Sequence, residues 1–340
     1  MGILVQYFVL YLGAEDRLGM AGNSVSFNLL IQQPNSPVQL MYANRALANK
    51  VSSLIERAFN QPLTVNRYGG SEITLHLGKV EAEETKPPIS LEYMRELSLL
   101  PQLQEQGDGI RAFAGMLLVI ITAQYPLVII DEPEAFLHPP QAYLLGRALA
   151  EQHAIGTQIL IATHSKDVIA GITSVKTTTD NVSIVRLTRK ATVNHATQIP
   201  PATVGELYKD PLIKYYPILD GLFFQGVVLC EGDSDCTYYR AVLESIDALD
   251  DGTKTSAVSV HFTHCGGKAR LPRAVSALRS AKVPVICAVD INFLQNEHEF
   301  NELIMAYKGD PNSVASLRNV VVNAVTAWST MMKRASTKAR

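Results

Sequence analysis

Two stretches of the chain place acidic residues directly after runs of apolar residues. The first is Leu127–Glu134 (LVIIDEPE), in which four apolar residues precede Asp131 and Glu132. Open α/β sheets bind their ligands at the carboxyl ends of buried strands of this kind. Nucleotide hydrolysis needs one carboxylate to hold Mg²⁺ and another to orient the attacking water. Adjacent residues at a strand end can fill both roles, although a solvated acidic turn after a core strand would give the same pattern.

A histidine follows the next apolar run along the chain. Gln158–Ala162 precedes a Thr-His-Ser sequence that contains His164. The separation from Asp131 fits one strand–helix–strand unit, with a helix expected over Pro139–Gln152 because proline suits the first turn. A histidine at a neighbouring strand end can contact the γ-phosphate of a nucleotide. A structural role would explain His164 by itself, but beside an acidic strand end we favour the functional interpretation.

The second acidic stretch follows the apolar run Gly226–Cys230 and contains Glu231 and Asp235. A later apolar run ends at Asp290 and is followed by Asn292. Carboxylates at the ends of two strands of one parallel sheet can converge on Mg²⁺, which prefers oxygen ligands. The alternative is a pair of helix N-caps at strand-to-helix turns, and the spacing alone favours neither interpretation.

These sites require two blocks in which strands and helices alternate. Such alternation indicates parallel sheets with right-handed crossovers, so we expect an α/β protein of two domains, 1–215 and 216–340. Residues 190–225 are expected to connect the blocks with helical pieces. The expected strands are Val5–Leu12, Val25–Ile31, Leu63–Tyr68, Glu72–Leu77, Leu127–Ile130, Gln158–Ala162, Val182–Leu187, Gly226–Cys230, Val258–Thr263 and Val283–Val289. The expected helices are Met41–Phe59, Ile110–Ala123, Pro139–Gln152, Lys166–Ala170, Asp235–Ile246 and Lys268–Ala281.

Composition limits the class of protein. Of 340 residues, 47% are hydrophobic and 18% charged, which suffices for packed cores and excludes a disordered chain. The net charge of -2 gives no global basic field, so nucleic-acid binding would need a local patch. Four cysteines without a C-x-x-C pair indicate neither a zinc site nor a disulfide framework, and fit a reducing cytoplasm. The uncharged stretch Ala112–Ile130 could span a membrane, but Pro126 interrupts it, which favours a buried helix, a turn and a buried strand.

The first acidic stretch resembles the Walker B segment of ABC-type ATPases. Residues 131–139 (DEPEAFLHP) are similar to the form D-E-P-E-x-x-L-H-P found in DNA-repair and defence ATPases. Residues 162–165 (ATHS) resemble the switch-histidine loop of the same proteins. The resemblance implies that Asp131 helps to bind Mg²⁺, that Glu132 is the catalytic base, and that His164 senses the γ-phosphate of ATP.

Gly107, Asp108 and Gly109 stand where this family has its signature motif, just before the helix that leads into the Walker B segment. By resemblance they would bind an ATP phosphate at a helix N-terminus, with Gly107 in place of the usual serine. An ordinary loop before a helix would look the same. The phosphate loop G-x-x-x-x-G-K-[ST] (Walker A) occurs nowhere in the chain. We therefore expect an incomplete P-loop NTPase core that is either an N-terminally truncated copy or dependent on another chain for this loop.

The second acidic stretch resembles a Toprim domain, the metal-dependent Rossmann-like fold of topoisomerases, primases and certain nucleases. Its mark is E-G-x-x-[DE] after a first strand and D-x-D after a third. The resemblance implies that Glu231 is a general acid/base and metal ligand, and that Asp235, Asp290 and Asn292 complete the metal site. Asn292 replaces an aspartate and brings no charge, so a second metal would bind more weakly. Nearby cations could form a patch for DNA phosphate: Lys268, Arg270, Arg273 and Arg279.

An ABC-type ATPase followed by a Toprim domain is the layout of the OLD family of ATP-dependent endonucleases. The resemblance covers most of residues 1–300 and implies ATP-gated, Mg²⁺-dependent cleavage of DNA. It also implies a homodimer or higher homo-oligomer that forms through the ATPase domain. We expect a cytoplasmic protein that does not bind a membrane. Two alternatives stay open: a regulatory or DNA-binding ATPase with a degenerate Toprim domain, and an inactive truncated product. Residues 301–340 match nothing that we can place, so the resemblance also allows a shortened Toprim domain.

Overall fold

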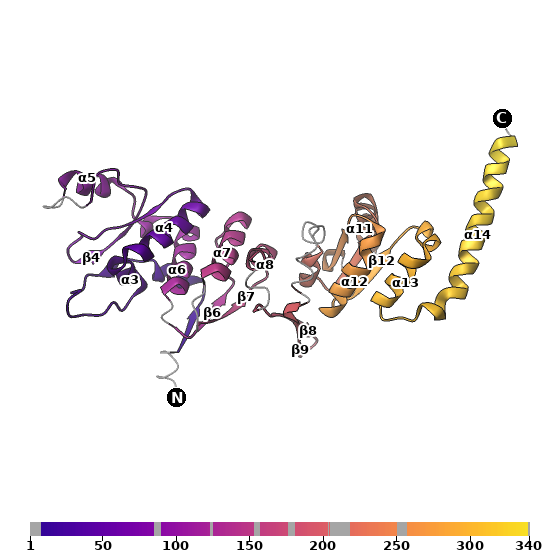
Figure 1. Ribbon diagram of the computed structural model, residues 1–340, viewed down its shortest axis with the longest axis horizontal. Coiled ribbons are helices and arrows are strands. Elements are labelled where there is room, and N and C mark those ends of the chain that lie inside the picture. The colour runs from indigo at the N-terminus through magenta and orange to yellow at the C-terminus, as the bar shows by residue number, and fades with distance from the viewer. Residues whose placement is uncertain are drawn as a thin grey trace. The chain divides into compact units, whose positions relative to one another are not determined.

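The computed structural model describes residues 8–84, 90–122, 125–152, 157–175, 181–202, 204, 218–249 and 257–338 (Figure 1). The chain divides into two compact units, Met1–Thr178 and Thr179–Arg340. Each unit contains a three-stranded parallel sheet connected by helices, which confirms the α/β class. Within the described residues, no helix combines the length and apolar character needed to cross a membrane.

The sheet of the first unit has the order β1-β6-β7, and all of its strands are parallel. The central strand β6 (Leu127–Asp131) lies between β1 (Val9–Leu12) and β7 (Gln158–Ala162). Helix α7 (Pro139–Gln152) connects β6 to β7, as the strand–helix–strand spacing predicts. The register pairs Asp131 with Ala162, so the acidic strand end and the start of the histidine loop lie at the same edge.

The core of the first unit forms around α6 (Asp108–Thr122), whose residues 112–120 are all buried. It packs against α2 (Ala14–Met20) and α4 (Arg45–Phe59). Only one face of the sheet is covered among the described residues, because side chains alternate along β6 and β7 between buried or half-buried and more exposed positions. The expected strand Gln158–Ala162 is thus present as β7, but it is not buried as its apolar run suggests, because its Leu160 is exposed.

The remaining elements of the first unit correct two expectations. The strand expected over Val25–Ile31 ends at Val25, and residues 29–31 form a turn instead. The helix expected over Met41–Phe59 is two helices, because the Asn44 side chain accepts a hydrogen bond from Leu47 N (3.1 Å) and starts α4 anew. The other elements are β2 (Ser24–Val25), α3 (Pro37–Ala43), β3 (Leu63–Val65), β4 (Glu72–Ile73), β5 (Leu75–Leu77), α5 (Leu91–Leu99), η1 (Leu103–Glu105) and α8 (Lys166–Thr173).

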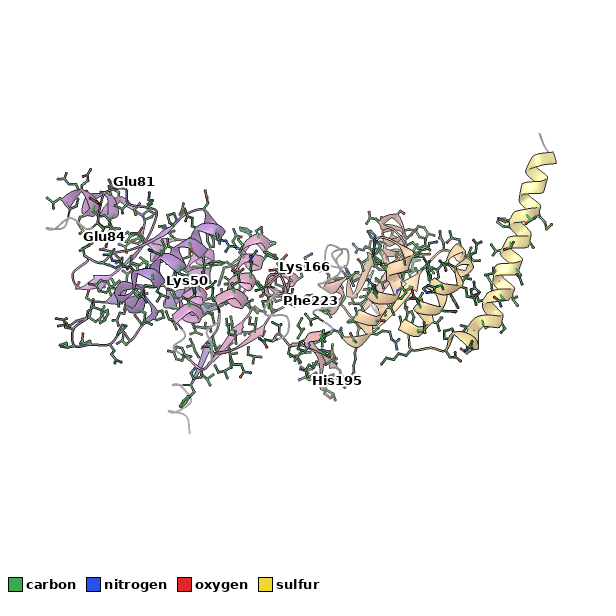
Figure 2. All side chains as sticks on the ribbon, in the orientation of Figure 1. Lys50, Glu81, Glu84, Lys166, His195 and Phe223 are labelled. Atoms are coloured by element: carbon green, nitrogen blue, oxygen red, sulfur yellow. The ribbon has the colours of Figure 1, made fainter. Side chains whose placement is uncertain are left out.

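The segment that leads to residue 84 is tied to α4 by polar contacts. Glu84 accepts hydrogen bonds from Arg45 and from the Tyr68 hydroxyl (3.3 Å), while Lys79 pairs with Glu81 (2.9 Å) (Figure 2).

The second unit has a sheet of order β11-β10-β12, again parallel throughout. Its strands are β10 (Gly226–Cys230), β11 (Val260–His264) and β12 (Val285–Ala288). Alternate residues of β10 enter different cores: Val227 and Leu229 pack with α12 (Leu271–Ser280), whereas Cys230 packs with residues of α11 (Asp233–Asp247). The sheet is therefore sandwiched between helices.

Residues 179–199 depart from the expected organisation. The stretch expected as a connector with helical pieces contains β9 (Val193–Ile199), which forms an antiparallel hairpin with β8 (Ile184–Lys190). Arg186 of β8 donates hydrogen bonds to the carbonyls of Leu222 (2.9 Å) and Phe224 (2.8 Å). These bonds explain why the compact units divide at 178/179, ahead of residue 215; the division into domains at 215 stays a prediction.

The end of the second unit is helical. Helix α13 (Glu297–Ala306) packs against α12, and α14 (Pro311–Lys338) follows it. Arg318 anchors α14 by donating to the carbonyl of Leu294 (2.8 Å), while Trp328 further along is exposed. The helix expected over Lys268–Ala281 begins as a 3-10 turn. The short elements are η2 (Leu219–Phe223), η3 (Ala257–Ser259), η4 (Lys268–Arg270) and η5 (Ile291–Gln295).

Candidate functional sites

The acidic end of β6 is shaped by its two neighbouring strands. Asp131 Oδ2 accepts a hydrogen bond from the Tyr11 hydroxyl on β1 (3.0 Å), and this bond raises the pKa of Tyr11. Glu132 N donates to the Ala162 carbonyl on β7 (2.8 Å), which extends the strand pairing by one residue. Glu132 then adopts a left-handed φ of 47°, so the chain turns away from the sheet directly after the two acids.

His164 lies between two acidic side chains. Glu134 accepts hydrogen bonds from Thr163 Oγ1 (2.7 Å) and from the His164 backbone (2.9 Å), and its side chain is only 10% exposed. The His164 Nδ1 atom is 3.2 Å from Glu134 Oε1 and 3.5 Å from Glu132 Oε1. Because the side chains of His164 and Glu132 are 72% and 59% exposed, both can meet a ligand. The structure thus brings three of the predicted ATPase residues together: Asp131, Glu132 and His164.

Arg17 on α2 supports this edge from the interior, and the sequence patterns did not single it out. Its side chain is fully buried and donates to the Glu132 carbonyl (2.8 Å). Burial lowers the pKa of Arg17, and the nearby carboxylates of Glu134, Asp131 and Glu132 oppose that shift. Its Nε and Nη2 atoms are buried without a hydrogen-bond partner among the described residues. A single arginine after an expected strand offers no motif, so sequence alone could not identify it.

The predicted signature residues lie at the start of α6. This helix begins at Asp108, which pairs with Arg111 (3.1 Å). A Cβ atom on Gly109 would lie 2.7 Å from the carbonyl oxygen of Phe136, so only glycine allows the helix start to approach the segment after the Walker B acids this closely. Gly109 therefore lies near that segment, whereas the role of Gly107, Asp108 and Gly109 toward a phosphate stays a prediction.

The second acidic site joins the ends of β10 and β12. Glu231 follows β10 directly, and its Oε1 accepts a hydrogen bond from the Asp290 backbone (2.7 Å). Asp235 Oδ2 accepts from Gly232 N (3.1 Å) and so closes the turn that starts α11. The structure places Glu231 and Asp290 at the same end of adjacent strands, and it places Asp235 in the first turn of α11, which follows Glu231.

The Lys268 side chain enters this acidic group. Its Nζ is 3.3 Å from Glu231 Oε2 and donates a hydrogen bond to Asn292 Oδ1. Within the described ranges, no group of three or more His, Cys, Asp or Glu side chains is placed to hold a metal ion. The sequence assigned Lys268 to a basic patch for DNA, and the structure turns it toward the acids instead. Arg270 also has internal partners, the carbonyls of Cys265 and Gly266.

The cysteine thiols are unsuited to nucleophilic chemistry. Burial raises the pKa of Cys230 to about 12 and that of Cys265 to about 11. Because the thiolate is the reactive form, thiols of this kind are inert near neutral pH.

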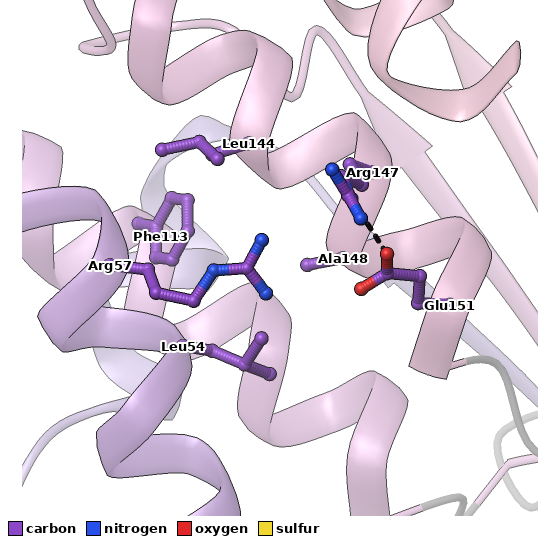
Figure 3. A pocket seen from close by; sticks show the side chains of 7 residues that line it. All are labelled: Leu54, Arg57, Phe113, Leu144, Arg147, Ala148 and Glu151. Atoms are coloured by element: carbon purple, nitrogen blue, oxygen red, sulfur yellow. Dashed lines mark hydrogen bonds and ion pairs between the residues drawn. The ribbon is translucent and has the colours of Figure 1, made fainter. Parts of the chain in front are cut away.

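A small pocket in the first unit lies among α4, α6 and α7 (Figure 3). The Arg57 guanidinium reaches into it, and Arg147 Nε pairs with Glu151 Oε1 (2.6 Å) at its rim. None of the predicted site residues lines it. Its lining residues are Leu54, Arg57, Phe113, Leu144, Arg147, Ala148 and Glu151.

Two family models match the chain in consecutive stretches. Residues 32–170 match "AAA domain, putative AbiEii toxin, Type IV TA system", and residues 222–291 match "Overcoming lysogenization defect protein-like, TOPRIM domain". The first range includes Asp131, Glu132 and His164, and the second ends one residue before Asn292. The chain thus contains a stretch that matches an ATPase domain, followed by a stretch that matches a Toprim domain. In domain content and order it matches an OLD-family ATPase–Toprim protein.

No curated protein matches the chain. Among solved structures, the Smc head domain with an extended coiled coil from Pyrococcus furiosus is 9% identical, with a TM-score of 0.34 over 49% of this chain and 37% of that chain. An SMC ATPase structure, from work on ATP-driven dimerization and DNA-stimulated activation of these proteins, is 9% identical, with a TM-score of 0.33 over 52% of this chain and 96% of that chain. At this level of similarity they add nothing to the assignment of the two domains.

Proposed function

We propose that this chain is an ATP-binding and ATP-hydrolysing protein of the OLD endonuclease type, in which nucleotide state gates Mg²⁺-dependent cleavage of DNA. The observation that carries the proposal is the meeting of Glu231 with Asp290 at adjacent strand ends of the Toprim domain. The exposed pair of Glu132 and His164 in the ATPase domain supports the nucleotide-dependent half of it.

In the ATPase domain, each polar group has a separate role. Asp131, held by the Tyr11 hydroxyl, would help to bind the Mg²⁺ that accompanies ATP. Glu132 would accept a proton from the attacking water, and its exposure lets water reach it. His164 turns Nδ1 toward Glu134, and its other ring nitrogen would contact a γ-phosphate oxygen. Gly107, Asp108 and Gly109 would bind a phosphate at the start of α6.

In the Toprim domain, the donor set suits Mg²⁺. Oxygens of Glu231 and Asn292 already converge on one positive charge, the Lys268 ammonium, and Mg²⁺ prefers oxygen donors. Glu231, Asp235, Asp290 and Asn292 would hold the ion, which when bound polarises a phosphodiester and acidifies a water molecule. Glu231 would also move the proton of the attacking group, as a general acid/base.

The proposed partners follow from these activities. DNA is the substrate, and a homodimer or higher homo-oligomer formed through the ATPase domain would place the α6 start of one copy against nucleotide bound by another. The sequence contains no G-x-x-x-x-G-K-[ST] loop, so residues 1–340 expressed alone should show little or no ATP hydrolysis. Robust turnover that Glu132→Gln leaves unchanged would contradict the assignment of the Walker B acids.

Nicking of supercoiled plasmid tests the nuclease half of the proposal. With Mg²⁺ the protein should convert the supercoiled form to the nicked form, and EDTA should prevent the conversion. Glu231→Gln and Asp290→Ala should each abolish nicking, whereas Glu132→Gln should retain the metal-dependent chemistry. DNA retention in a gel shift without any nicking would instead support a regulatory, DNA-binding ATPase, the alternative favoured by the uncharged Asn292 and its contact with Lys268.

A further inference from the structure

The position of Lys268 bears on how the Toprim site takes up metal. Two side-chain oxygens from different strand ends, Glu231 Oε2 and Asn292 Oδ1, converge on its ammonium group. The side chains of Lys268 and Glu231 are 29% and 17% exposed, so this contact is partly shielded from water. It therefore differs from an ordinary surface ion pair, which contributes little because solvent screens it.

The backbone fixes Lys268 in this place. The preceding Gly266 and Gly267 have φ values of 70° and 136°, which non-glycine residues rarely adopt. Arg270 clamps the same turn by donating to the carbonyls of Cys265 (3.3 Å) and Gly266 (2.6 Å). The turn at the end of β11 thus delivers the lysine across the carboxyl ends of β10 and β12.

The acidic side chains around Lys268 carry enough negative charge to hold its ammonium group in place. Glu231, Asp235 and Asp290 contribute three formal negative charges, Asn292 contributes none, and Lys268 returns one positive charge. An ammonium and a divalent ion cannot share the same two oxygens, because like charges within a few ångströms repel strongly. Metal uptake at Glu231 and Asn292 therefore requires that Lys268 leave.

We propose that Lys268 is a resident cation of the Toprim site that competes with divalent metal for Glu231 and Asn292, and thereby sets the metal affinity of the site. This inference rests on the proposed metal-dependent function and deepens it. Lys268 is a positioning residue here: it holds the two oxygens together without metal, and its withdrawal opens the place for the ion.

Direct Mn²⁺ binding to residues 1–340, measured by titration calorimetry without nucleotide or DNA, tests the proposal. Lys268→Met removes the charge but keeps an unbranched side chain, and should tighten Mn²⁺ binding about ten-fold. Lys268→Arg keeps the charge and should stay near the wild-type affinity. Lys282→Met, a matched loss of charge at an exposed residue of the same unit, should also leave the affinity unchanged.

Two further variants locate the effect. Adding Glu231→Gln to Lys268→Met should remove the gain, because the oxygen that Lys268 releases is then neutral. Asn292→Asp with Lys268 present should tighten binding less than Lys268→Met does, since the competing cation remains. Circular dichroism of each variant confirms that it is folded.

Three results would overturn the inference. If Lys268→Met binds Mn²⁺ no more tightly than wild type while wild type binds well, Lys268 does not compete, and the metal site itself still stands. If the gain survives Glu231→Gln, the ion binds elsewhere and the inference fails. If no variant binds Mn²⁺, both this inference and the metal-dependent function fail.

Discussion

The two acidic strand ends of this protein balance their charge in opposite ways. In the ATPase domain, the cation is Arg17, buried behind the acids and bonded to the backbone of Glu132. In the Toprim domain, the cation is Lys268, which lies among the acid side chains themselves. The first arrangement leaves Glu132 and His164 open to a ligand, and the second occupies the oxygens that a ligand ion would use.

This difference shows that the same sequence pattern, acids directly after a strand, can give either an open acidic group or one already paired with a cation. Acids after a buried parallel strand locate a site in both domains, because such strands end at one edge of the sheet. Whether the site is open depends on where the counter-charge comes from, and that is decided by distant segments. Arg17 stands more than a hundred residues before Glu132, and Lys268 reaches Glu231 from another strand end.

The largest expected effect tests how firmly backbone packing holds the open site. A Cβ on Gly171 of α8 would lie 2.1 Å from the Tyr143 carbonyl of α7, so α8 could not keep its place behind the His164 loop. We expect Gly171→Ala to destabilise the first unit by about 3 kcal/mol or more. Urea unfolding followed by hydrogen exchange, resolved by unit, should show the loss in the first unit alone. Gly107→Ala, where a Cβ meets nothing within 4 Å, is the matched control.

The second prediction concerns the buried counter-charge. Arg17→Met keeps the volume but leaves the Glu132 carbonyl without its donor and three carboxylates without a nearby cation. We expect a loss of about 2–3 kcal/mol in the unfolding free energy of the first unit. Arg17→Lys keeps the charge and should lose less. Unchanged stability of Arg17→Met would mean that the cost of desolvating Arg17 equals the free energy of its contacts. Arg17 and Lys268 would then differ in where they lie, and Arg17 would not stabilise the first unit.

Much of the fold could be predicted because strand–helix alternation reads directly from apolar runs and their spacing. The expected strands over Leu127–Ile130, Gln158–Ala162 and Gly226–Cys230 agree with β6, β7 and β10. The hairpin strand β9 was not predicted, because its sequence VNHATQI shows no run of apolar residues. It is a strand because its backbone pairs with that of β8. Helix α14 was missed for a related reason: it has little tertiary packing to impose a pattern.

In the candidate sites, too, residues within a motif could be predicted, whereas residues that arrive from distant parts of the chain could not. Sequence motifs single out Asp131, Glu132 and Glu231 as candidates because each follows its strand within the same segment, and the structure places all three at strand ends. They could not locate Arg17, and they gave Lys268 the opposite partner, DNA phosphate in place of acids. A lysine after a glycine turn is equally compatible with binding DNA phosphate and with pairing to nearby acids. The register of β10 with β11 and β12 brings it to Glu231.

The third prediction concerns Glu134, whose side chain holds the loop that contains His164. Glu134 accepts hydrogen bonds from Thr163 Oγ1 and His164 N, and its side chain is largely buried. Glu134→Gln removes its charge and weakens both bonds, so we expect a loss of about 1–2 kcal/mol in the first unit. Hydrogen exchange should rise at residues 163–165. Glu81→Gln, at an exposed pair with Lys79, is the control and should change stability little.

The smallest effect is a pH dependence confined to the second unit, which contains all four cysteines. Burial raises the pKa of Cys230 to about 12 and of Cys265 to about 11, above the value near 8.5 of an unfolded thiol. Stability from the neutral thiols is therefore complete below about pH 8.5 and declines as the pH rises toward the folded values, because only the unfolded chain releases protons. Between pH 8 and 9.5, the urea midpoint of the second unit should fall more than that of the first unit, whose raised tyrosine pKa values take effect only nearer pH 10. The variant Cys230→Ala with Cys265→Ala should flatten this decline. An equal decline in both units, or one that the variant does not change, would show that buried thiols do not distinguish the second unit from the first.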